Sequence, residues 1–289
     1  MPIIGAHVST AGGLHNCFAN AQKIGAECLQ IFVANPQQFK ARDLTAAEVD
    51  LFKSEWKKSK LGPVFAHASY LVNLASPDNK VRFGGLNNLI GHFKIAAALK
   101  LQGLIFHLGA AKGGNRAEAI VRMAEMMKKA LAAVSGSAPL ILENTAGGGT
   151  KLGASPEEFG EICRKVKSNR VKICLDTAHM FEAGWLCRFD KKELDEFVRR
   201  CDSAFGWAKV AALHINDSAT ACGSHHDRHE NIGEGKIGLA GFQQLAVHPK
   251  FNKLPWILEV PGFSGEGPDK KNVRILKELF NKQSKQSKQ

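Results

Sequence analysis

The feature that most constrains this chain is a short apolar, strand-like run that recurs eight times, with a helix-like segment between successive runs. The runs are IIGAHV, CLQIFVA, PVFAHA, GLIFHLG, PLILENT, VKICLDTA, VAALHIND and PWILEV. Most are almost continuously apolar, as is typical of parallel strands buried on both faces. This alternation, uninterrupted by a linker, predicts an α/β protein with one (β/α)8 TIM barrel.

Three helix starts are marked by capping signals. Thr45, Ser155 and Asp190 each precede a glutamate by three positions, which is the spacing of an N-cap with a carboxylate that reaches back. No Gly-x-Gly-x-x-Gly pattern follows the first run, which argues against a dinucleotide-binding fold.

The composition is that of one folded domain. The chain has 289 residues, of which 44% are hydrophobic and 23% charged. We expect residues 1–281 to form the barrel and residues 282–289 to be a disordered basic tail, because no apolar residue follows Phe280. No stretch has the roughly 18 apolar residues of a membrane helix, and no leader pattern is present, so we expect a cytoplasmic protein.

Seven cysteines are scattered along the chain without a Cys-x-x-Cys pair. Several lie inside apolar strand-like runs, where a thiol packs as a small hydrophobic group. The sequence therefore predicts reduced, structural cysteines and no cysteine zinc site.

The net charge of +12 favours a polyanionic partner, with nucleic acid the obvious candidate. A lysine-rich surface that only maintains solubility is the alternative on composition alone.

Ionisable side chains fall at or near the carboxyl ends of successive strand-like runs. They are His67, His107, Glu143, Asp176, His214 and Glu259. In a parallel barrel these ends meet at one mouth. Any one of them could be a satisfied core residue. Three buried carboxylates at one mouth would repel one another unless cations neutralise them, and imidazole with carboxylate suits zinc, manganese or iron. The set therefore predicts a metal site.

Two further pairs lie just beyond strand ends, Asp176 with His179 and Asp227 with His229. Their short spacings let neighbouring side chains reach a common ion. His179, Asp227 and His229 then form a separate three-ligand centre. The other six residues serve two more metals, with Glu143 as the natural bridge.

Most of these residues lie in longer segments: HASYLVNLASP, LENTAGGGTKLG, DTAHMFEAG, HINDS and DRHENIGEGKIG. In order and spacing these segments resemble the motifs of the endonuclease IV family, the trinuclear zinc TIM-barrel AP endonucleases (AP endonuclease family 2). The likeness extends from GAHVSTAGG near the start to LEV near the end.

The resemblance implies a partition of the ligands among three zinc ions, with manganese possible at some sites. His67, His107 and Glu143 would hold one ion; Glu143 would also reach a second, bound by Asp176, His214 and Glu259; His179, Asp227 and His229 would hold the third. Glu143 and Glu259 would be catalytic, with Glu259 orienting the water that attacks.

The resemblance also implies the reaction. It is hydrolysis of the phosphodiester 5′ to an abasic site in double-stranded DNA, which leaves a 3′ hydroxyl and includes trimming of blocked 3′ ends, in base excision repair. We expect a monomer.

Three residues are expected to touch the DNA. Tyr70 matches a family residue that contacts DNA beside the lesion, and Leu71 follows it. Gln37 stands where some members carry an arginine that probes the duplex. The alternative for Tyr70 is a loop aromatic that packs on a barrel helix.

Two other functions compete. Xylose-isomerase-like sugar isomerases and epimerases also place carboxylates and histidines at strand ends around one or two metals, and the fold does not discriminate. Asp227 and His229 together with His179 favour the nuclease, because a mononuclear isomerase needs no further ligand triplet. A basic barrel that binds DNA without cutting it is the third possibility.

Overall fold

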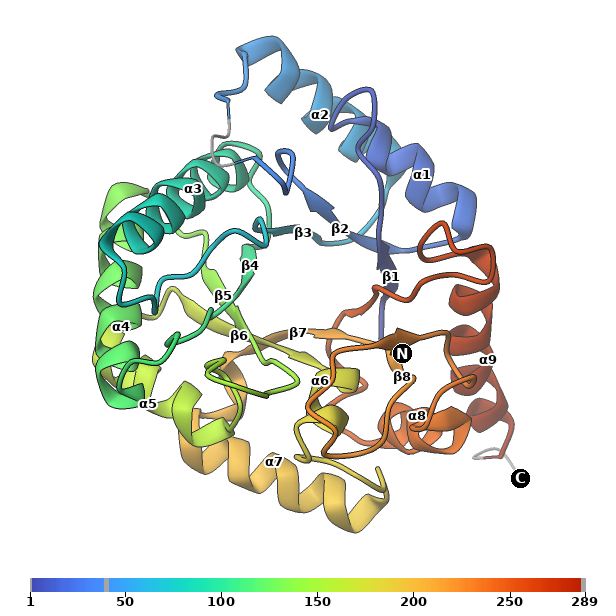
Figure 1. The fold of residues 1–289 in the computed structure, drawn as a ribbon. Helices are drawn as coiled ribbons and strands as arrows, with labels where there is room; N and C mark the ends of the chain where they lie inside the picture. The colour runs from blue at the N-terminus through green and yellow to red at the C-terminus, as the bar shows by residue number, and fades with distance from the viewer. Residues whose placement is uncertain (1, 39–41, 287–289) are drawn as a thin grey trace.

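The computed structural model, which describes residues 2–38 and 42–286, shows a closed barrel of eight parallel strands (Figure 1). In order of pairing the strands are β1 (Ile4–His7), β10 (Trp256–Leu258), β7 (Val210–His214), β6 (Val171–Asp176), β5 (Leu140–Glu143), β4 (Leu104–His107), β3 (Val64–His67) and β2 (Cys28–Phe32). Each of the eight strand-like runs contributes one strand. The prediction of a single-domain (β/α)8 barrel is confirmed.

Helices surround the barrel, as Figure 1 shows. They are α1 (Asn16–Ile24), α2 (Ala46–Ser59), α3 (Asn79–Ala98), α4 (Arg116–Ala133), α5 (Pro156–Val166), α7 (Lys191–Phe205), α8 (Gly238–Val247) and α9 (Lys270–Gln286). A short helix, α6 (Thr177–Glu182), follows β6 directly, and a 3-10 turn, η1 (Trp207–Lys209), precedes β7. Strands β8 (Asp217–Ser218) and β9 (His229–Glu230) form a small antiparallel sheet beyond the carboxyl end of β7.

The three predicted helix starts are confirmed. Thr45 and Glu48 form a reciprocal capping box at α2, and the Ser155 and Asp190 side chains accept backbone N–H groups at the starts of α5 and α7. Because such caps satisfy otherwise unpaired N–H groups, these helix boundaries can be located from the sequence.

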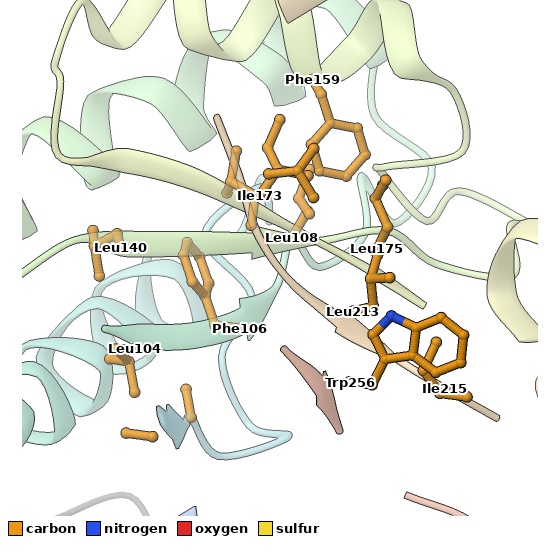
Figure 2. Packing of buried hydrophobic residues seen from close by; sticks show 14 of the residues in the cluster. Leu104, Phe106, Leu108, Leu140, Phe159, Ile173, Leu175, Leu213, Ile215 and Trp256 are labelled. Carbon is orange, nitrogen blue, oxygen red and sulfur yellow. The ribbon is translucent and has the colours of Figure 1, made fainter. Parts of the chain in front are cut away.

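The core has two layers. The larger lies between strands and helices, and Figure 2 shows part of it, including Phe106, Leu175 and Phe159. The smaller fills the barrel interior and consists of Cys28, Phe65, Ile105, Ile141, Cys174, Ala212 and Ile257. The inner layer makes the barrel a packed core rather than a pore. The polar residues nearer the carboxyl ends of the strands therefore lie directly above this inner apolar layer.

Helix α9 continues to Gln286, so residues 282–286, for which composition predicts disorder, are helical in this structure. Lysine and glutamine are good helix formers. The earlier turns of α9 are held against the barrel by the buried residues Val273, Leu276 and Phe280, and residues 282–286 continue that helix. Residues 287–289 of the expected tail lie outside the described part of the chain.

The expectation of reduced cysteines is wrong for one pair. Cys187 and Cys222 form a disulfide with a Cα–Cα distance of 5.5 Å and a sequence separation of 35. The fold brings the segment after α6 beside the segment before β9, a proximity that no local spacing reveals. Cys17, Cys28, Cys174 and Cys201 are free and buried, and burial raises the pKa of the Cys28 thiol to about 12.

None of the helices among the described residues is both long and apolar enough to span a membrane.

Replacing Phe159 with alanine should lower the free energy of unfolding by about 3–5 kcal/mol, because the ring is fully buried and its loss leaves a cavity. The ring also lies edge-on to Trp185 at 6.2 Å. Urea unfolding followed by circular dichroism measures the change. Phe263→Ala, at a ring that is 38% exposed, is the matched control and should cost about 1 kcal/mol or less. Equal losses in the two variants would contradict the assigned core.

Candidate metal centre

The strand register places imidazoles beside carboxylates. In the β4–β5 pair His107 lies opposite Glu143, and in the β6–β7 pair Asp176 lies opposite His214. Each of these residues ends its strand, and Glu259 follows β10 by one position. Since all eight strands are parallel, their carboxyl ends share one mouth. The six strand-end residues predicted from sequence therefore meet there.

Glu143 lies at the middle of this group and has no solvent exposure. Its Oε2 is 3.0 Å from His67 Nε2, and its Oε1 is 2.8 Å from His214 Nδ1. His107 and His179 approach it at 3.5 and 3.6 Å. Burial alone would raise the pKa of the Glu143 carboxyl, but the surrounding imidazoles hold it well below its usual value. Glu143 is thus a buried carboxylate whose charge depends on nearby cationic groups.

Donor atoms at the mouth form three compact groups, in each of which all donor atoms lie within 4.8 Å of one another. The groups are His67, His107 and Glu143; Glu143, Asp176, His214 and Glu259; and Asp176, His179 and His229. The first two have the membership expected from sequence. Glu143 belongs to both, which is the position expected of a bridge.

The third group differs from expectation in one member, because Asp176 joins His179 and His229. Asp227, the predicted third member, contacts both histidines: its carboxylate oxygens lie 3.3 Å from His179 Nε2 and 3.7 Å from His229 Nε2. Asp227 is the most exposed of the four, since it lies on the loop before β9. The predicted triplet is therefore brought together, with Asp176 beside it.

Four buried ring nitrogens of the predicted ligands lack well-formed hydrogen bonds among the described residues. They are His107 Nδ1, His179 Nδ1 and Nε2, and His229 Nε2, all buried. The outward nitrogen of His67 is paired, because Nδ1 donates to the Ala68 carbonyl at 2.8 Å. A buried unpaired nitrogen is costly, and a divalent cation is a partner that neutral imidazole and carboxylate can share. The residues present fit a cluster of metal ions.

His179 carries the clearest electrostatic signature of this arrangement. Burial alone would lower the pKa of its imidazole, but the carboxylates of Asp176 and Asp227 raise that pKa to about 10. Without a metal ion, a proton on His179 balances the negative charge of its neighbours. A bound cation would take over that role and release the proton.

A cavity of about 840 Å³ opens above the cluster and is lined by histidines, Glu259 and Tyr70. Tyr70 is 67% exposed, and its ring lies edge-on to Phe32 with centroids 5.6 Å apart. Tyr70 and Leu71 also line an adjoining cavity of about 560 Å³. Gln37 is exposed on the loop after β2, where its backbone N–H donates to the Asn35 side chain at 2.9 Å.

Several polar residues of the centre are not predicted from the sequence. His7 Nδ1 lies 3.1 Å from Glu259, and Gln30 contacts both Glu259 and His214. Asn216 donates to Asp176 Oδ2 at 2.6 Å. In the sequence, His7 and Gln30 are marked only by their inward positions on the strands β1 and β2. Asn216 is marked only by its place two residues after His214. None of these signals identifies a partner.

Comparisons with known proteins agree on the fold and point to one group of enzymes. A family model described as a xylose isomerase-like TIM barrel matches residues 18–281. "Probable endonuclease 4" of Nitratidesulfovibrio vulgaris (strain DP4) is 38% identical over 285 residues, covering 96% of this chain and 99% of the relative. "Probable endonuclease 4" of Chloroflexus aggregans is 35% identical over 281 residues, covering 96% and 98%.

Solved structures of an endonuclease IV and of a sugar epimerase-like protein also superpose on this chain. Endonuclease IV from Thermus thermophilus superposes with a TM-score of 0.85 at 31% identity, covering 97% of this chain and 100% of that one. A D-tagatose 3-epimerase-like protein superposes with a TM-score of 0.74 at 18% identity, covering 97% of this chain and 99% of that one, which is a likeness of fold alone.

In the metal-free protein His179 should keep its extra proton at pH 8, because its pKa is raised to about 10. Long-range nitrogen–proton NMR of the imidazole measures this directly. Asp227→Asn should lower the pKa of His179, since it removes the carboxylate 3.3 Å from Nε2. Asp43→Asn, at an exposed residue before α2 that does not act on His179, should leave this pKa unchanged. Titration of His179 near 6.5 in the parent protein would contradict the described electrostatics.

Proposed function

The chain belongs to the endonuclease IV family, and from that premise we propose that it is a zinc-dependent AP endonuclease. It hydrolyses the phosphodiester 5′ to an abasic site in double-stranded DNA, leaves a 3′ hydroxyl, trims blocked 3′ ends and acts in base excision repair. The observation that carries this proposal is the meeting of nine imidazole and carboxylate residues at the mouth of one barrel, beside an exposed tyrosine.

The three donor groups correspond to three zinc ions per chain, with manganese an alternative occupant of some sites. His67, His107 and Glu143 would hold one; Glu143, Asp176, His214 and Glu259 would hold another; His179, Asp227 and His229 would hold the third. Ions bound there would lower the pKa of bound water and neutralise charge on the phosphodiester. All nine donors lie on one chain, so completing the centre requires no second chain.

Glu143 and Glu259 have distinct tasks. Glu143 is enclosed, and its two oxygens face different histidines, so it ties two ligand groups together. Glu259 lines the open cavity and keeps Oε2 3.1 Å from His214 Nδ1. A carboxylate at the cavity wall can accept a hydrogen bond from an incoming water and orient it toward a phosphodiester. We therefore assign water positioning to Glu259.

The surroundings of the cluster suit a damaged duplex. An abasic nucleotide leaves the helix at low cost, because it has no base to unstack or unpair. The exposed ring of Tyr70 can stack on a base next to the gap, with Leu71 beside it and Gln37 on the neighbouring loop. The net charge of +12 favours association with phosphates.

A sugar isomerase or epimerase is the main alternative on this fold. The cluster of His179, His229 and Asp227 argues against it, because an isomerase with one or two metals has no use for a further set of ligands. The basic charge also fits a polyanion better than a neutral sugar.

Elemental analysis after zinc supplementation, combined with incision of an abasic duplex, tests the proposal. We expect three zinc ions per chain, corresponding to the three donor groups, and a cut 5′ to the lesion with a 3′ hydroxyl. A protein that holds one metal or fewer and leaves the duplex intact would redirect the assignment to the isomerase.

Glu259→Gln should abolish incision while the affinity for abasic DNA stays close to that of the parent, because the change removes one carboxylate and no DNA-facing aromatic. Single-turnover cleavage and fluorescence anisotropy measure the two quantities. Glu266→Gln, at an exposed glutamate that lines the same cavity, is the matched control and should retain activity. Near-normal incision by Glu259→Gln would disprove its role.

Tyr70→Ala should reduce the preference for abasic over intact duplex by about tenfold, since stacking on a base contributes about 1–3 kcal/mol. Tyr70→Phe, which keeps the ring, should preserve it, and neither change should alter metal content. Competition binding with the two duplexes measures the ratio. Equal affinity of the parent for damaged and intact DNA would refute lesion recognition at this position.

A further inference from the structure

Gln30 is a buried amide inside the barrel with no solvent exposure. Its strand, β2, alternates: Cys28 belongs to the inner apolar layer, whereas Leu29 and Ile31 pack in the outer layer against the helices. Gln30 therefore points inward, one level above Cys28 toward the mouth. A buried amide at that level must find polar partners, and it finds them among the proposed metal ligands.

Three contacts define the position of the amide. Gln30 Nε2 donates to Glu259 Oε1 at 2.5 Å, Gln30 Oε1 lies 2.8 Å from His214 Nε2, and Gln30 Nε2 lies 3.0 Å from His7 Nδ1. His214 ends β7 and Glu259 directly follows β10, and neither of these strands is a direct neighbour of β2 in the barrel. One side chain thus links two ligands of the same donor group.

The chemistry of these contacts permits only one arrangement of protons. An ionised carboxylate only accepts hydrogen bonds, so the amide nitrogen of Gln30 must face Glu259. The amide oxygen then faces His214 Nε2, and that nitrogen must donate. Nδ1 lies 2.8 and 3.1 Å from carboxylate oxygens of Glu143 and Glu259, so without a metal ion it carries a proton as well. A metal ion at this group would displace the Nδ1 proton, whereas the Nε2 proton would stay bonded to Gln30 Oε1.

We propose that Gln30 is a positioning residue that sets the tautomer of His214 and the orientation of Glu259, and thereby prepares one metal site of the cluster. The equivalent support for His67 comes from a backbone carbonyl, that of Ala68, which substitution cannot remove. For His214 it comes from a side chain. Gln30 is therefore a position at which the outer support of this group can be varied without touching a ligand.

The inference rests on the metal-binding part of the proposed function and is tested separately from it. Gln30→Met keeps a similar volume and removes all three contacts of the amide. Outer partners of metal ligands contribute about 10–100-fold to metal affinity. We expect the dissociation constant of one zinc per chain to rise by about that factor, while the more distant His67–His107 group keeps its affinity.

Competition with a chromophoric chelator measures the affinities, and the visible spectrum of the cobalt-substituted protein reports the altered geometry of one ion. The kcat for abasic incision should fall in parallel, with KM for the duplex unchanged within about twofold, because Gln30 is enclosed and the loss is of metal support. Ile31→Val, a packing change at the adjacent outward position, is the matched control and should leave all metal affinities unchanged.

A measurement on the zinc-loaded parent protein keeps the inference testable if Gln30→Met does not fold. Nitrogen NMR of His214 should show a proton on Nε2 and none on Nδ1. A proton on Nδ1, or full metal affinity in Gln30→Met, would overturn the inference. A parent protein that binds no zinc would instead refute the proposed function.

Discussion

The fold around the centre depends on one buried charge, the carboxylate of Glu143. Four histidines each bring a ring nitrogen within 3.6 Å of it, and they are His67, His107, His179 and His214. An uncompensated carboxylate at zero exposure would destabilise the barrel by several kcal/mol. The protein meets this constraint with imidazoles from four separate elements, which can balance the charge either with protons or with a shared cation. The imidazoles that offset the cost of burying the Glu143 carboxylate also favour the binding of a metal cluster.

Ligands that do not lie on barrel strands need other support, and buried carboxylates supply it. Glu182, on α6, accepts hydrogen bonds from Ser218 Oγ at 2.7 Å and from the Arg228 backbone at 3.1 Å. Arg228 lies between Asp227 and His229, so this contact holds the loop that carries both. Asp217 accepts backbone N–H groups from Gly233 and Ile237 at 2.9 Å each, which fixes the segment after β9. The Cys187–Cys222 disulfide adds a covalent tie nearby.

Much of this can be predicted from the sequence because two local signals coincide. Apolar runs mark buried parallel strands, and a charged residue at the end of such a run, as at Glu143 or Asp176, is too costly to be placed there without a partner. Parallel topology then brings all such ends together. The six strand-end residues therefore follow from strand identity, without knowledge of register.

The remainder depends on contacts between elements that are not neighbours in the sheet, or on the path of a loop, which the sequence does not encode locally. In the sequence, Gln30 is one polar residue in an apolar strand. Only the fold shows that Glu259 and His214 lie against it. Asp176 joins the third donor group only because α6 turns His179 back over the end of β6. The composition of the tail misleads for a different reason, since it cannot show that α9 extends a helix whose earlier turns are buried.

Anomalous diffraction at the zinc absorption edge, from crystals of the zinc-loaded protein, tests the central claim most directly. The account predicts a cluster of three peaks at the barrel mouth, corresponding to the three donor groups, with both oxygens of Glu143 at about 2.0–2.2 Å from separate ions. Zinc peaks confined to the outer surface, with Glu143 still bonded only to histidines, would contradict it.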